Sequence, residues 1–359
     1  MLSKYPSEKI LTIGPDYHNH RGGIGAVIEI YSKYFVDFKF LASFKVGSTL
    51  FKSIFFAGFL LKLFLKLIID RRIKIIHIHG ASYGSFIRKF ICFIIAKYIF
   101  QKKVIYHIHG AEYHLFYSCS NGFIKSLIKL FINNTDCIIC LSIAWKNFFE
   151  SNFNPNKIEI VPNIIDYPSL SSIEREKSIL TFLFLGIIGN RKGVFDLLEV
   201  ISANKDKYSG KIKLVIGGNG ETDRLTQIIK EHNLKDLIEF VGWITKEEKN
   251  AWLQRADIYI LPSYNEGLPI SILEAMSYGK AIISTKVGGI PEIVIPSENG
   301  ILIEPGNSQQ LESAIDFFIE NHHIIDNYGE KSKSLVKKHL PYSVLDKLSL
   351  IYETLLNDE

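Results

Sequence analysis

The sequence predicts an α/β protein of two domains, each built around a doubly wound parallel sheet. Its 359 residues exceed what one typical hydrophobic core organises, so two domains of about 150–190 residues are expected. Short apolar runs alternate with helical stretches in the first half of the chain, and the alternation restarts after a polar, proline-containing break. Hydrophobic residues make up 47% and charged residues 22% of the chain, which is typical of a folded globular protein.

The first half carries the pattern of a parallel sheet covered by helices. Helical spacing of apolar residues appears over 51–69 and 86–100. Strands that alternate with helices in this way pair in parallel, because each helix returns the chain to the same end of the sheet. The apolar runs that we interpret as strands are 10–14, 75–79, 104–109, 137–141 and 158–161.

A short motif occurs twice in this half. The run His77-Ile78-His79-Gly80-Ala81 returns, 30 residues later, as His107-Ile108-His109-Gly110-Ala111. That offset is about one strand–helix–strand unit, so the two copies are expected on neighbouring parallel strands. Both then lie at the carboxyl ends of their strands, where ligands bind in open α/β sheets.

The domain boundary is predicted from a break in the pattern between Pro162 and Lys177. We expect a first domain over residues 1–165, a second over 166–340, and a helix within 341–359 that packs back toward the first. The strands expected in the second domain are 180–185, 212–216, 238–241, 258–261, 281–284 and 300–303.

The charge is distributed unevenly between the two halves. Residues 1–165 hold 21 Lys and Arg against 9 Asp and Glu, a surplus of +12, whereas the remainder has a net charge of −7. A basic half joined to an acidic half suggests that the first half meets something anionic.

The chain is expected to be cytoplasmic or peripheral at a membrane. Its start lacks the pattern of a signal peptide, and its longest apolar run, 53–61, is shorter than the about 20 residues that a membrane span needs. The four cysteines are too few for a disulfide framework, and Cys137 and Cys140 lie three apart on an expected strand, which favours two buried thiols.

The strongest motif runs from Asn265 to Ala275. Glu266 follows a strand, and Gly267 allows a ligand to approach the backbone closely. A helix is expected to begin at about Pro269, and its free N–H groups and dipole favour an anion. Glu274 lies in that helix, where its carboxylate suits the hydroxyl pair of a sugar. Two solvated surface glutamates would have the same spacing.

Two glycine-containing loops offer further phosphate sites. The loop from Gly186 to Gly193 contains Arg191 and Lys192, and cations before a helix suit a diphosphate, although a solvated basic turn would look the same. Gly22 and Gly23 follow the first strand, where they either accommodate a ligand or simply allow a tight turn.

These motifs together resemble the E-x7-E signature of the retaining glycosyltransferases of family 4. Glu266 and Glu274 have that spacing, and Gly288-Gly289 and Pro291-Glu292 follow as in the family. The resemblance extends over nearly the whole chain. It implies the GT-B fold, in which two Rossmann-like domains face each other across a cleft.

The resemblance also implies roles for single residues. Glu274 would bind the ribose hydroxyls and Glu266 a hydroxyl of the donor sugar. Lys192 matches the lysine of the family's G-R-x4-K-G, whereas its arginine position is Ile187 here, so Arg191 could supply the missing charge. The remaining implied site residues are the amides of Gly267 and Leu268 at the sugar or diphosphate, Gly22 and Gly23 at the phosphates or acceptor, His109 near the donor sugar, and Ile244 at the base.

We expect neither a metal site nor a cofactor. The two His-x-His-Gly runs could suggest zinc, but no acidic or cysteine ligands stand beside them. The chain also has no D-x-D triplet, which the other large glycosyltransferase fold uses to hold a divalent metal on the diphosphate.

The predicted activity is transfer of a hexosyl unit, with retention, from a nucleoside diphosphate sugar to a saccharide acceptor. A UDP-sugar is favoured and a GDP-sugar is possible. The segment 51–74 interleaves apolar residues with Lys62, Lys66, Arg71 and other cations, which suits an anionic bilayer as well as a helix buried on its sheet. We therefore expect a polyprenyl-diphosphate-linked acceptor in bacterial surface polysaccharide synthesis, as in O-antigen, exopolysaccharide or capsule.

Three alternatives remain. Two carboxylates would also suit a glycosidase, but hydrolysis has no need of a phosphate site. A GT-B nucleotide-sugar epimerase would release product without an acceptor. A nucleic-acid-binding protein would use the basic half, although its basic residues are scattered rather than clustered.

Overall fold

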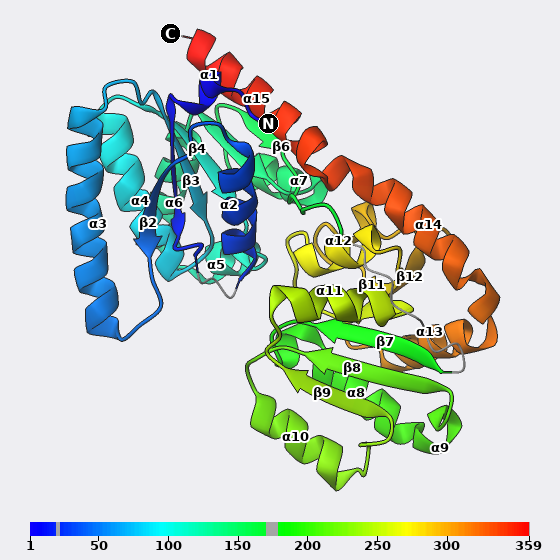
Figure 1. The fold of residues 1–359 in the computed structure, drawn as a ribbon. Helices are drawn as coiled ribbons and strands as arrows, with labels where there is room; N and C mark the ends of the chain where they lie inside the picture. The colour runs from blue at the N-terminus through cyan, green and yellow to red at the C-terminus, as the bar shows by residue number, and fades with distance from the viewer. Residues whose placement is uncertain (19–21, 170–178, 359) are drawn as a thin grey trace. The chain divides into compact units, whose positions relative to one another are not determined.

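The computed structural model describes residues 1–18, 22–169 and 179–358, and these form two compact units. Unit 1 comprises Met1–Asp166 together with His339–Glu359, and unit 2 comprises Tyr167–Lys338. Each unit has its own six-stranded sheet with helices on both faces (Figure 1).

The sheet of unit 1 has the order β2-β1-β3-β4-β5-β6, and every neighbouring pair is parallel. Its strands are β1 (Ile10–Pro15), β2 (Lys39–Phe44), β3 (Ile75–Gly80), β4 (Lys103–Ile108), β5 (Cys137–Cys140) and β6 (Ile158–Ile160). Its helices are α1 (Lys4–Ser7), α2 (Gly23–Tyr34), α3 (Thr49–Ile69), α4 (Gly84–Ile94) with the π-helical turn Ile95–Ile99, α5 (Tyr113–Cys119), α6 (Gly122–Asn134), α7 (Ile143–Asn152) and α15 (Pro341–Asn357).

The edge strand β2 is missing from the sequence-based prediction. Only Ser43 of its six residues is fully buried, because the strand pairs on one side with β1 alone. Its sequence therefore lacks the continuous apolar run that marks the central strands of a parallel sheet.

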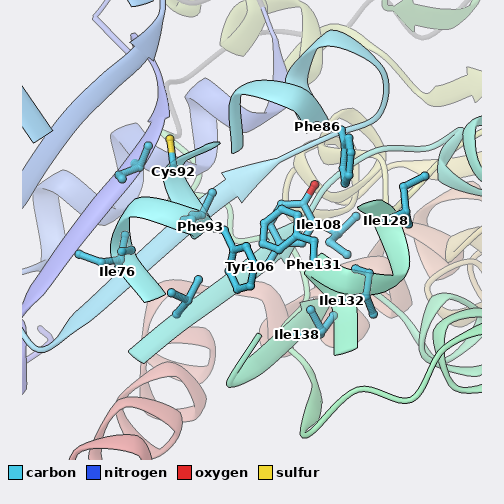
Figure 2. Packing of buried hydrophobic residues seen from close by; sticks show 14 of the residues in the cluster. Ile76, Phe86, Cys92, Phe93, Tyr106, Ile108, Ile128, Phe131, Ile132 and Ile138 are labelled. Carbon is cyan, nitrogen blue, oxygen red and sulfur yellow. The ribbon is translucent and has the colours of Figure 1, made fainter. Parts of the chain in front are cut away.

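The two faces of the central strands have different partners, because successive side chains point to opposite sides. Ile76 of β3 and Tyr106 of β4 belong to an apolar core with Phe86 and Phe93 of α4 and Phe131 of α6 (Figure 2). Burial of each such side chain contributes about 1.5–3 kcal/mol relative to exposure.

The opposite face carries the histidines. His77 of β3 and His107 of β4 are fully buried there, and Tyr352 of α15 shares a 2.6 Å hydrogen bond with His77 Nδ1. The last helix of the chain therefore belongs to unit 1. The predicted pairing of the two His-x-His-Gly runs is confirmed, because His79 and His107 are register partners on parallel strands.

Unit 2 contains all six strands expected from its sequence, in the order β12-β11-β10-β7-β8-β9 and all parallel. They are β7 (Leu180–Leu185), β8 (Ile212–Gly217), β9 (Ile238–Gly242), β10 (Ile258–Leu261), β11 (Ala281–Thr285) and β12 (Gly300–Ile303). The helices are α8 (Val194–Ala203), α9 (Lys205–Tyr208), α10 (Thr222–Glu231), α11 (Lys246–Arg255), α12 (Ile270–Ser277), α13 (Ser308–Glu320) and α14 (Ile325–Leu335).

Each sheet has one point at which the direction of strand order reverses. In unit 2 this switch point lies between β7 and β10, and in unit 1 it lies between β1 and β3. Ligands of open α/β sheets bind outside the carboxyl ends of the strands at such points. The topology therefore predicts that ligands bind at the loops that follow β1, β3, β7 and β10.

Candidate functional site

The loops after β7 and β10 bring two predicted residues into contact at the switch point of unit 2. Lys192 Nζ lies 2.5 Å from Glu266 Oε1, although 73 residues separate them in the chain. Ser263 Oγ donates a second hydrogen bond to the same oxygen at 2.7 Å. The Glu266 side chain is 7% exposed, so both partners hold this carboxylate in one orientation.

Arg191 connects the same two loops through the backbone. Its guanidinium donates to the carbonyl of Asn265 at 3.0 Å, and the N–H of Tyr264 donates to the carbonyl of Arg191 at 2.9 Å. Ile187, at the family's arginine position, is 49% exposed. Arg191 therefore adds a positive charge beside the Glu266 loop and also orders that loop.

Glycines allow these loops to pack backbone against backbone. Gly193 has φ 68°, and a Cβ there would lie 2.0 Å from the carbonyl oxygen of Pro262. Gly288 has φ 54°, and a Cβ there would lie 2.0 Å from the carbonyl oxygen of Glu266. Any other residue at either position would push the loops apart, since both φ values also disfavour side chains.

Glu274 lies in α12, which follows the Glu266 loop. Pro269 is the N-cap of this helix, so the helix begins one residue later than the sequence suggests. Glu274 Oε1 pairs with Lys249 Nζ of α11 at 2.6 Å, and its side chain is 24% exposed. Gly267 accepts a backbone hydrogen bond from Gly289 at 2.7 Å, and Leu268 is buried.

Sequence reasoning missed Lys249 and Ser263. No motif marks Lys249, which lies 25 residues before Glu274 and reaches it only through the packing of α11. Ser263 stands three residues before Glu266, where the short spacing was the only available signal. Each glutamate of the E-x7-E motif thus has its own lysine.

His109 directly follows β4 in unit 1 and belongs to a cluster of four histidines. His109 and His79 share a hydrogen bond of 2.9 Å, and His77 and His107 share one of 3.3 Å. Desolvation lowers the pKa of His77 to about 3 and that of His109 to about 4. The imidazole of His109 is therefore neutral at pH 7 and can exchange hydrogen bonds but carries no charge.

Three histidines of this cluster have the proximity that a metal site requires. His77, His79 and His107 offer nitrogens that all lie within 4.8 Å of one another. However, the rings of His77 and His79 stack at 4.3 Å with 28° between their planes, so their in-plane lone pairs run side by side instead of converging. Tetrahedral zinc needs nitrogens that converge at about 2.0–2.1 Å. The arrangement fits a hydrogen-bonded network better.

The remaining predicted residues belong to other loops of the two sheets. Gly22 is the N-cap of α2, which begins at Gly23, and a Cβ on Gly22 would meet no atom of the described residues within 4 Å. Packing therefore does not require glycine there. Ile244 follows β9, and its Cδ1 lies 3.4 Å from the Cβ position of Gly217 at the end of β8.

Two family models match the chain, one in each half. "Glycosyltransferase Family 4" matches residues 41–167, and "Glycosyl transferases group 1" matches residues 171–335. The chain is 30% identical over 244 residues to an uncharacterized glycosyltransferase of Methanocaldococcus jannaschii, a match that covers 65% of this chain and 62% of that relative. The match thus spans less than two thirds of the relative's length.

Solved structures resemble this chain over almost its full length. Sucrose-phosphate synthase from Thermosynechococcus elongatus has a TM-score of 0.78 at 17% identity, covering 98% of this chain and 99% of that one. HepE of Anabaena in complex with UDP has a TM-score of 0.74 at 17% identity, covering 97% and 100%. Among the described residues, no helix is both long and apolar enough to cross a membrane.

The fold is that of the GT-B proteins, with one parallel sheet in each of two units. The two family matches leave only residues 1–40, 168–170 and 336–359 uncovered. The chain belongs to the family 4 type of glycosyltransferases.

Proposed function

We propose that this protein transfers a hexosyl unit from a nucleoside diphosphate sugar, with UDP as the favoured nucleotide, to a saccharide hydroxyl with retention of configuration. The observation that carries the proposal is the Lys192–Glu266 pair, which Ser263 orients at the switch point of unit 2. The likeness to HepE, whose structure holds UDP, supports the choice of nucleotide.

The chemistry follows from the charges at this site. A diphosphate oxygen takes the place of Glu266 as partner of the Lys192 ammonium, and Glu266 then accepts a hydrogen bond from a donor-sugar hydroxyl. The bond between the anomeric carbon and the phosphate oxygen breaks as the bond to the acceptor oxygen forms. The acceptor proton passes to the departing phosphate. Lys192 stabilises the charge that grows on the leaving group, and such preorganised charges are a major source of catalysis.

The remaining site residues position the donor. Glu274, held by Lys249, binds the ribose hydroxyls. Arg191 and the amides of Gly267 and Leu268 face the sugar or diphosphate, and Ile244 faces the base. Gly22, Gly23 and His109 of unit 1 keep the roles that the family resemblance implies. No metal is required in this scheme, so activity should survive EDTA. Loss of activity on chelation that Mn²⁺ or Mg²⁺ restores would contradict it.

The acceptor is proposed to be linked to a lipid, and helix α3 supplies the argument. One stripe of α3, Phe59, Leu63 and Leu67, faces the core. The opposite stripe, with Leu61 and Ile68 62% and 50% exposed, is also apolar. Burial against the sheet accounts for the first stripe alone.

This outer face has the character of a membrane-binding surface. Its large exposed side chains are Leu50, Ile54, Leu61, Phe64, Leu65 and Ile68. An apolar patch of this extent on a surface marks an interaction site. Lys62 and Lys66 stand beside it, so an anionic bilayer satisfies both its apolar and its charged groups. We therefore propose a polyprenyl-diphosphate-linked saccharide acceptor, of the kind used to build bacterial surface polysaccharide.

A donor panel tests the proposal directly. Purified protein is incubated with UDP-, GDP- and ADP-sugars, with and without saccharide acceptors, and released nucleotide and product are measured. We expect turnover of one UDP-sugar that an acceptor accelerates. A free sugar product made equally well without acceptor would favour the epimerase, and no turnover with any donor would contradict the proposal.

A further inference from the structure

Two consecutive basic residues of α4 lie at the carboxyl edge of the sheet of unit 1. The Lys89 ammonium contacts the hydroxyl of Ser43 in β2, and Lys89 is only 2% exposed. The guanidinium of Arg88 lies 4.7 Å from the ring centroid of Phe44, the next residue of β2. Its Nη1 would be 3.7 Å from a Cβ on Gly84, the first residue of α4. Both cations thus lie between the end of β2 and the start of α4.

These cations have no counter-charge in the part of the chain that the structure describes. Among the described residues, the partner of Lys89 is the Ser43 hydroxyl, which itself donates to the carbonyl of Gly14 at 2.9 Å. Arg88 Nε and Ser82 Oγ are buried and have no hydrogen-bond partner within the described ranges of the chain. Desolvation lowers the pKa of Lys89 to about 8, which reflects the cost of holding this charge away from water. Unpaired buried cations are rare, because their burial is costly without a partner.

The place of these groups in the fold is that of a ligand site. Gly14 lies one residue before the end of β1, and α4 follows β3, so the cations flank the switch point of unit 1 between those strands. The start of α4 adds the positive end of a helix dipole, and its N-cap residue, Tyr83, makes no side-chain cap hydrogen bond. Two cations, unmet donors and a helix start at one switch point are complementary to an anion with several oxygens.

We propose that Arg88 and Lys89 form a binding site for a phosphate or diphosphate group, and that this group belongs to the acceptor. Arg88, the more exposed of the two, contacts the anion, and Lys89 supplies a fixed positive charge beneath it. The assignment to the acceptor rests on the proposed function, since the donor's diphosphate has its own lysine in unit 2. The ligand class is a phosphorylated compound, either a lipid-linked diphosphate or a water-soluble one.

The test measures anion binding in a Lys192→Gln background, which removes the diphosphate partner in unit 2. Calorimetry with inorganic pyrophosphate should give binding that Arg88→Gln weakens at least tenfold and Lys89→Met abolishes. Lys129→Gln, which removes an exposed lysine of unit 1, is the matched control and should leave binding unchanged. Because binding is measured without turnover, failure of the donor panel does not affect the result.

Stability separates a binding role from a structural one. Lys89→Met removes an unpaired buried charge, so its ligand-free melting temperature should equal or exceed that of the parent. A large drop in the melting temperature of Lys89→Met, together with unchanged pyrophosphate binding by Arg88→Gln, would overturn the proposal. Binding to micelles that contain polyprenyl diphosphate, compared with micelles that contain neutral polyprenol, shows whether the anion belongs to a lipid. Retention of diphosphate micelles alone assigns the lipid, and binding of free pyrophosphate alone assigns a water-soluble anion.

Discussion

The two units have the same parallel-sheet architecture but differ in whether the cations near their switch points are paired with acids. In unit 2 the lysines are paired, Lys192 with Glu266 and Lys249 with Glu274. In unit 1 Arg88 and Lys89 have no acid near them among the described residues, and the adjacent strands carry neutral histidines. The topology determines where a ligand can bind, whereas the loops determine its chemistry. A lysine paired with a glutamate can exchange that carboxylate for the diphosphate of a donor. Cations without a paired acid suit an anionic ligand that supplies the counter-charge.

The largest effect is expected at the Lys192–Glu266 pair. Lys192→Met should lower the rate of sugar transfer by about 10²–10³, the usual loss when one preorganised charge at a leaving group is removed. The measurement is turnover at saturating donor. Lys207→Met is the matched control, because Lys207 also pairs with acids in unit 2 but on the exposed face. If both variants retained full turnover, the pair would be structural.

Glu274→Ala should weaken nucleotide binding by about 2–4 kcal/mol, because a carboxylate bound to two hydroxyls is lost. Titration calorimetry with UDP measures the change. Lys249→Met should have a smaller effect in the same direction, since Lys249 only orients the carboxylate. Unchanged affinity in Glu274→Ala would exclude this residue from the nucleotide site.

Unit 1 should lose stability in acid because its histidines are buried in the neutral form. The pKa of His77 is lowered to about 3 in the folded state against an ordinary value of 6.5, so the unfolded chain binds more protons between these values. The contribution of neutral His77 to the free energy of unfolding is complete above pH 6.5. It falls as the pH drops, and at pH 5 it is smaller by about 2 kcal/mol. Chemical unfolding at pH 7 and pH 5 measures this slope, which His77→Gln should flatten. An equally steep slope in that variant would assign the acid sensitivity elsewhere.

The smallest effect per residue is expected at the membrane surface. Lys62→Glu with Lys66→Glu should reduce sedimentation with anionic vesicles, at about 1 kcal/mol for each lysine removed. High salt should act in the same direction, because the Debye length falls to about 3 Å at 1 M. The matching pair in unit 2, Lys230→Glu with Lys235→Glu, should bind as the wild type does. Equal binding by all three proteins would make a soluble acceptor the better interpretation.

Much of the fold follows from local patterns in the sequence. The six strands of unit 2 and the pairing of β3 with β4 are evident because buried parallel strands leave continuous apolar runs. The edge strand β2 is not, since most of its residues are only partly buried. Gly193 and Gly288 are visible as glycines in the sequence. Only the folded loops show that a backbone carbonyl packs against each of them and leaves no space for a side chain.

The candidate site divides in the same way. Glu266, Glu274 and Lys192 are recognisable as candidates in the sequence, because the two glutamates share one motif and the lysine lies in one glycine-containing loop. The folded chain is needed to show which lysine pairs with each glutamate, and that Arg88 and Lys89 contact no acid among the described residues. Local patterns report backbone periodicity and turn chemistry. The balance of charge around a buried group depends on side chains that lie tens of residues apart and become neighbours only when helices pack on the sheet.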